Sequence, residues 1–126
     1  MVYFSSLVGG ITVSASIAIM TVLQGMFKGD DDCKKAHTVM FWTTMAALLG
    51  TIAIFIINWL PLIPATGKAA ITSIAAFFII LAIAGGNSMA AAVTKMNECA
   101  KGRMYAIINT IVLVLIDVIV LILFFI

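Results

Sequence analysis

The sequence has few charged side chains and few of the residue types from which catalytic sites are built. Only 10% of the 126 residues are charged, one is a histidine and two are cysteines, whereas 64% are hydrophobic. Soluble domains carry about 25% charged residues. The chain contains no serine elbow, glycine-rich phosphate loop or nucleic-acid motif. The composition excludes an ordinary soluble domain, and we expect neither an enzyme nor a nucleic-acid binder, and no cofactor.

Four long apolar runs make up most of what is present. They cover about residues 3–27, 38–60, 69–93 and 104–126. Each meets the roughly 20-residue length that a helix needs to cross a hydrocarbon core of about 30 Å. Lipid offers backbone amides no partner, so isolated runs of this length must be α-helices. The sequence predicts an all-α, polytopic integral membrane protein, with residues 1–126 forming one four-helix transmembrane domain of two consecutive hairpins.

The connecting segments indicate how these helices are oriented. Six of the seven basic residues lie in loops 28–37 and 94–103, and only Lys68 lies on the opposite side. By the positive-inside rule both basic loops are predicted to be cytoplasmic and both termini to lie on the other side. Pro61, Pro64 and Gly67 predict a tight turn that makes the second and third helices antiparallel neighbours.

The two cysteines fall in these basic loops. Cys33 and Cys99 would lie on one side of the membrane, which makes a disulfide sterically open. A reducing cytoplasm opposes it, so we expect free thiols. Cys33 and His37, beside Asp31 and Asp32, have the side-chain types of a zinc site. They lack the paired spacing of such sites, and we expect no metal.

A shift of 66 residues superposes the first hairpin on the second. It places Cys33 on Cys99, and the other identical pairs are Lys35 and Lys101, Ile17 and Ile83, Ala18 and Ala84, Thr44 and Thr110, and Ile56 and Ile122. Such a repeat would be parallel, with both hairpins in the same orientation. A chain this rich in isoleucine and alanine can produce these matches by chance, so the sequence leaves duplication open.

Asp117 stands alone as a carboxylate within an apolar run. No Lys, Arg or His lies in any span to compensate its charge. Desolvation without a cation disfavours the ionised form, so we expect a protonated acid. Intramembrane acids serve transport, or take a hydrogen bond in the interior or at a subunit contact. The other intramembrane polar candidates are Asn87, Ser14, Ser16 and Thr51.

Small residues at four-residue spacing mark two helices as packing elements. They are Ser6, Gly10, Ser14 and Ala18 in the first run, and Ala82, Gly86 and Ala90 in the third. Small residues at this spacing let helix backbones approach closely in lipid. The pattern predicts that the first and third helices are central. It fits both packing within the bundle, which we favour, and oligomerisation.

The expected function follows from small size and the lack of extramembrane mass. We expect a structural or assembly subunit of a membrane protein complex or a virion membrane. Its partners would be the lipid bilayer and other membrane or capsid-type subunits, a second copy of the chain among them. The alternative is a small channel or a proton-coupled transporter that uses Asp117. The environment of that side chain distinguishes these classes.

Overall fold

The computed structural model describes residues 1–27, 31–93 and 100–126, and the side chains of residues 31–33, 100 and 101 are outside this description. The described residues form four helices, namely α1 (Val2–Met26), α2 (Asp31–Trp59), α3 (Ala65–Val93) and α4 (Ala100–Phe125). All four are long and apolar enough to cross a membrane. The predicted fold class, an all-α membrane protein with four transmembrane helices, is confirmed.

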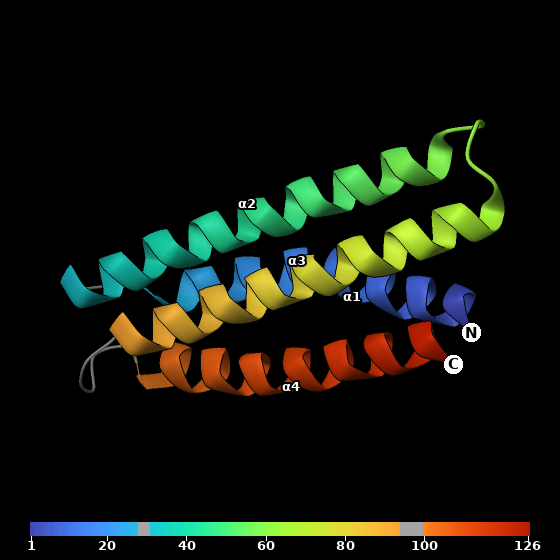
Figure 1. Cartoon of the computed structure of the whole chain (residues 1–126). Helices are drawn as coiled ribbons and strands as arrows, with labels where there is room; N and C mark the ends of the chain where they lie inside the picture. The colour runs from blue at the N-terminus through green and yellow to red at the C-terminus, as the bar shows by residue number, and fades with distance from the viewer. Residues whose placement is uncertain (28–30, 94–99) are drawn as a thin grey trace.

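The helices form two antiparallel hairpins that lie side by side. Both termini and the turn between α2 and α3 lie at one end of the bundle, which we call the terminal end (Figure 1). Helices α1 and α3 each contact all the other helices, whereas α2 and α4 share no contact within the described ranges. The expectation that α1 and α3 are central is therefore confirmed. Which end faces the cytoplasm stays a prediction.

Three helices begin at least four residues earlier than the apolar runs predicted. Helix α2 begins at Asp31 instead of residue 38, and α3 and α4 each begin four residues before the expected start. Hydropathy marks the part of a helix that lies in hydrocarbon, and the polar first turns extend beyond it. The turn between α2 and α3 is also shorter than expected. Pro64 directly precedes α3, its carbonyl accepts a hydrogen bond from Lys68 N at 2.9 Å, and Gly67 lies inside the helix.

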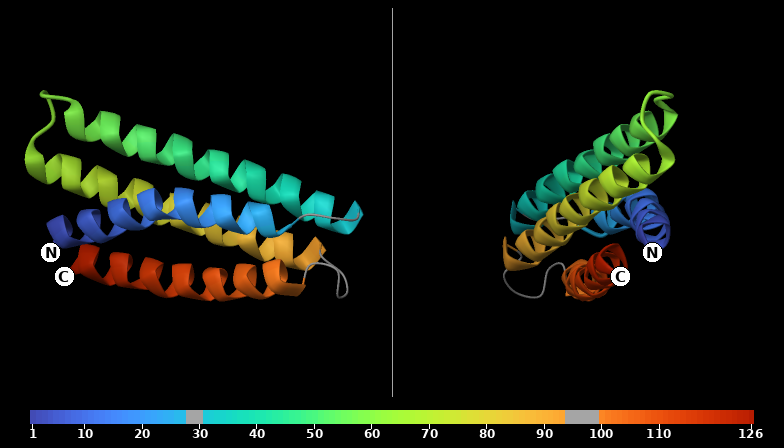
Figure 2. Two further views of the ribbon diagram at one scale, coloured as in Figure 1. Left: turned by 180° about the vertical axis from the view of Figure 1, so that it is seen from behind. Right: turned by 45° about the vertical axis from the view of Figure 1, so that its right-hand side comes forward.

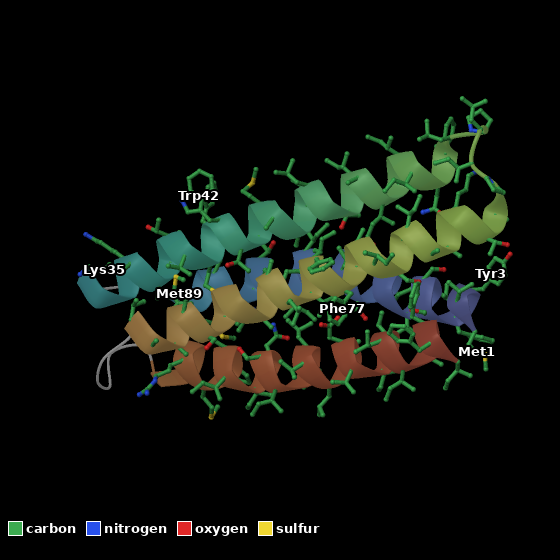
Figure 3. The ribbon with its side chains drawn as sticks, in the orientation of Figure 1. Met1, Tyr3, Lys35, Trp42, Phe77 and Met89 are labelled. Atoms are coloured by element: carbon green, nitrogen blue, oxygen red, sulfur yellow. The ribbon has the colours of Figure 1, made fainter. Side chains whose placement is uncertain are left out.

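The interior combines aliphatic side chains with small polar ones. Fully buried apolar residues include Val13, Met20, Ile80 and Ile83, and Ser5, Ser16, Ser73, Asn87 and Asp117 are buried with them. Most other large apolar side chains point outward, as expected for helices that face lipid. Figure 3 shows one of them, Trp42, which points away from the neighbouring helices and is 66% exposed.

The two hairpins occupy equivalent places about the centre of the bundle. Adding 67 to the number of each buried α1 residue gives a buried α3 residue. The pairs are Ser5 and Thr72, Gly9 and Ala76, Val13 and Ile80, Ser16 and Ile83, Met20 and Asn87, and Leu23 and Ala90. Two of these pairs, Gly9 with Ala76 and Met20 with Asn87, are in direct contact across the α1–α3 interface. Helices α1 and α3 thus meet about an approximate two-fold axis.

Candidate functional site

Asp117 lies in the interior of the chain's own bundle. It is 2% exposed on the face of α4 that also buries Leu113 and Val120, and α4 contacts α1 and α3 only. Its Oδ1 has no hydrogen-bond partner among the described residues. The side chain therefore does not face an outer surface, and no hydroxyl of the described chain bonds to Oδ1. For a structural acid we considered a hydrogen bond to a neighbouring hydroxyl or a position at a subunit contact, and among the described residues Oδ1 of Asp117 has neither.

Asn87 is buried at the centre of the α1–α3 interface. Its Nδ2 donates to the carbonyl of Ile83 at 2.8 Å and lies 3.3 Å from Sδ of Met20. Its Oδ1 has no partner among the described residues. Helix α3 is continuous through Gly85 and Gly86, so the backbone carbonyls are not released as they are at a broken transport helix. Asn87 acts here as a packing residue.

The remaining polar candidates divide between the interior and the surface. Ser16 is buried, and its hydroxyl donates to the carbonyl of Thr12 at 2.7 Å. Thr51 donates in the same way to Ala47 at 2.8 Å. Ser14 is exposed. Ser14 and Thr51 lie together in one groove, which Asp117 does not line.

The small-residue stripe of α1 faces outward. Ser14 and Ala18 are exposed, and a Cβ atom on Gly10 would meet no atom within 4 Å. The close approach is made by Gly9, where a Cβ would lie 2.6 Å from Cβ of Ala76. Ser14 and Ala18 thus make no packing contact within the bundle that buries them, whereas Ser6 and Gly10 are half-buried.

The corresponding stripe of α3 is divided. Ala90 is fully buried, and Gly86 packs against Thr43 of α2, whose side chain would clash with a Cβ at that position. Ala82 is exposed. On α3 the small residues thus serve packing within the bundle at two of three positions.

Three of the interhelical hydrogen bonds that the sequence did not anticipate connect described residues of different helix pairs. Ser5 Oγ donates to the carbonyl of Val120 at 2.8 Å, Asn58 Nδ2 donates to Thr72 Oγ1 at 2.9 Å, and Ser73 Oγ donates to the carbonyl of Val2 at 3.4 Å. All three lie near the terminal end. The sequence around Ser5, Asn58 and Ser73 has no feature that distinguishes them from polar residues whose side chains bond within their own helix.

A groove of about 800 Å³ opens between α1 and α2 at the terminal end, and we call it the α1–α2 groove. The two helices diverge toward this end (Figure 2, left). The groove is lined by Tyr3, Ser6, Leu7, Gly10, Ile11, Ser14 and Ala15 of α1, by Thr51, Ile54, Phe55 and Asn58 of α2, and by Thr72 of α3. It is the largest described hollow that carries polar side chains on a face turned to lipid.

The loop candidates lie largely outside the described part of the chain. This applies to Cys99 and to the side chains of Asp31, Asp32 and Cys33, so both the disulfide and the free thiols stay untested. Among the residues that the structure describes, no group of three or more His, Cys, Asp or Glu could hold a metal ion. Comparison with known protein families, with curated proteins and with solved structures finds no match.

Proposed function

We propose that this chain is a structural subunit of a larger membrane-embedded assembly, in a membrane protein complex or a virion membrane. The observation that carries the proposal is the outward face of α1 beside the α1–α2 groove. There Gly10 has open space around it and Ser14 is exposed. Small residues on a lipid-facing surface allow another helix to approach closely, and hydroxyl groups bond across such contacts.

The wall of the groove supports the same interpretation. Asn58 is exposed on α2, and it directs its Nδ2 toward Thr72 while the groove remains open beside it. Polar side chains are costly against hydrocarbon and are stabilised when a neighbouring helix covers them. A partner in the groove would remove Ser14 from lipid and cover Asn58. A structural subunit therefore accounts for a surface that is unfavourable for an isolated monomer.

Transport through Asp117 is the second candidate, and one observation favours it. The carboxyl group is buried and its Oδ1 has no partner among the described residues, which leaves an oxygen available for a proton or a cation. However, Asp117 lines neither the α1–α2 groove nor the two smaller grooves, one between α1 and α4 that includes Val22 and Asn109 and one between α3 and α4 that includes Ser73 and Phe77. A transport route would need an opening that reaches this position.

The assembly proposal is tested by extracting the chain from its native membrane into polymer-bounded lipid discs and measuring the protein mass in each disc. We expect more protein than one 13.4 kDa chain. The variant Gly10→Phe should leave a single chain, because the ring occupies the open face of α1. In Gly85→Phe the ring enters equally open space on α3, and the assembly should persist. A wild-type chain that is always alone in its disc would overturn the proposal.

A further inference from the structure

The α1–α2 groove has a counterpart in the other half of the molecule. A smaller groove of about 270 Å³ lies between α3 and α4 near the terminal end. Seven of its eight lining residues correspond to lining residues of the α1–α2 groove, with an offset of 67 for α1 and α3 and of 66 for α2 and α4. The pairs are Ser6 and Ser73, Leu7 and Ile74, Gly10 and Phe77, Ile11 and Phe78, Ile54 and Val120, Phe55 and Leu121, and Asn58 and Phe124.

The two grooves differ in what fills them. In the α3–α4 groove Phe77 and Phe124 contribute aromatic rings from the two facing helices. Gly10 and Asn58 stand at these places in the α1–α2 groove. The second hairpin thus fills its groove with its own side chains, whereas the first hairpin leaves the equivalent α1–α2 groove open. Bulky apolar side chains from another molecule would complete it, as the two phenylalanines complete its counterpart.

The apolar ridge next to the groove provides such side chains. Phe4, Leu7 and Ile11 are 57%, 56% and 60% exposed on α1, and Leu7 and Ile11 form the edge of the groove itself. Ridge and groove therefore lie side by side on one helix. A two-fold rotation about an axis along the membrane normal brings each ridge to the other molecule's groove, which is the self-complementary arrangement of a symmetric dimer. Two copies inserted in the same direction satisfy this rotation.

We propose that the α1–α2 groove binds the Phe4, Leu7 and Ile11 ridge of a second copy of this chain, which makes α1 the core of a parallel homodimer. The glycine at position 10 and the hydroxyl of Ser14 lie where the two α1 helices cross. Close approach at a glycine and hydrogen bonding between hydroxyls both stabilise helix pairs in lipid. This inference rests on the proposed assembly function and names the partner.

A photoreactive benzophenone side chain in place of Ile11 tests the proposal. The full chain is purified, reconstituted in phosphatidylcholine vesicles and irradiated, and the same is done in native membranes. We expect a product of twice the 13.4 kDa chain mass in both, with the crosslink at groove residues such as Thr51 or Phe55. Crosslinking to lipid alone in both preparations would overturn the dimer and the assembly proposal together. A crosslink to a different protein in native membranes, with no dimer in vesicles, would overturn the second copy but leave the assembly.

Substitutions that copy the second hairpin provide the matched controls. Gly10→Phe copies Phe77, and Ser14→Leu copies the residue 67 positions later, Leu81. Each should raise the protein-to-lipid ratio needed for half-maximal dimer at least tenfold, the change that about 1.4 kcal/mol produces. The ring at Gly85→Phe lies outside the groove and should leave this ratio unchanged. Folding of each variant is verified by its thermal unfolding, and folded groove variants that dimerise like the wild type would refute the assignment of the groove.

Discussion

The adjacent glycines Gly9 and Gly10 should respond in opposite ways to the same substitution. A Cβ at position 9 would lie 2.6 Å from Cβ of Ala76, whereas a Cβ at position 10 would meet nothing within 4 Å. Neither of the two clashing atoms is the end of a flexible side chain, so relief requires α1 and α3 to move apart. We therefore expect Gly9→Ala to destabilise the fold and Gly10→Ala to be neutral or slightly stabilising.

The magnitude follows from the difference between the two variants. Replacing glycine by alanine in a helix interior favours the helix by up to about 1 kcal/mol, and this gain is common to both positions. Overpacking a close interface costs about 1–3 kcal/mol, and it applies to Gly9→Ala alone. The difference in free energy of unfolding between Gly9→Ala and Gly10→Ala should therefore be about 1–3 kcal/mol, which corresponds to roughly five- to 150-fold in the folding equilibrium.

The assay is reversible unfolding in mixed micelles at high detergent-to-protein ratio, where the chain is monomeric and the outer face of α1 makes no contact. The double variant Gly9→Ala with Ala76→Gly removes the opposing methyl group and should recover most of the lost stability, as a double-mutant cycle requires for two contacting residues. Equal stability of the two single variants, or a double variant no better than Gly9→Ala, would show that α1 and α3 do not meet at this pair.

Two further predictions concern orientation and Asp117. Single cysteines are placed at the exposed positions Ala65 and Arg103 in a background that lacks Cys33 and Cys99. They should react with an impermeant reagent from opposite sides of the membrane, Ala65 from the non-cytoplasmic side. Labelling of both from one side would contradict the four-span topology. For Asp117→Asn we expect dimerisation to be retained and the stability to change by no more than about 1 kcal/mol, the scale of a membrane hydrogen bond. Liposomes with wild-type protein should show no pH-driven proton flux above protein-free liposomes, and a flux that disappears in Asp117→Asn would favour the transporter.

The helices themselves could be predicted from the sequence because the membrane leaves little choice. A run of about 20 apolar residues can satisfy its backbone in lipid only as a helix, and the structure has a helix over every such run. The starting residues of the helices could not be predicted, because hydropathy marks the edge of the hydrocarbon core and a helix can extend beyond that edge. Helix α3, for example, begins at Ala65, four residues before its apolar run and directly after Pro64.

The face that each helix turns inward was harder to predict. Small residues recur on α1 at Ser6, Gly10 and Ser14, but Ser5, Gly9 and Val13 form an equally regular row one residue earlier. Four-residue spacing fits both rows, and the identity of the buried one depends on the partner helix. Ala76 opposite Gly9 and the carbonyl of Val120, which accepts a hydrogen bond from Ser5, decide it. No periodicity within α1 contains that information.

The approximate symmetry separates the two candidate functions in space. Asp117 belongs to the second hairpin and is enclosed by α1, α3 and α4, whereas its counterpart 66 residues earlier, Thr51, lines the open α1–α2 groove of the first. Asp117 is not among the residues that line the α1–α2 groove. Substitutions at sites without shared partners act independently. Gly10→Phe should therefore abolish dimerisation without altering any proton flux, and Asp117→Asn should do the reverse if transport occurs. A single substitution that removes both properties would mean that the two halves act as one unit, with the dimer contact controlling access to the buried carboxyl group.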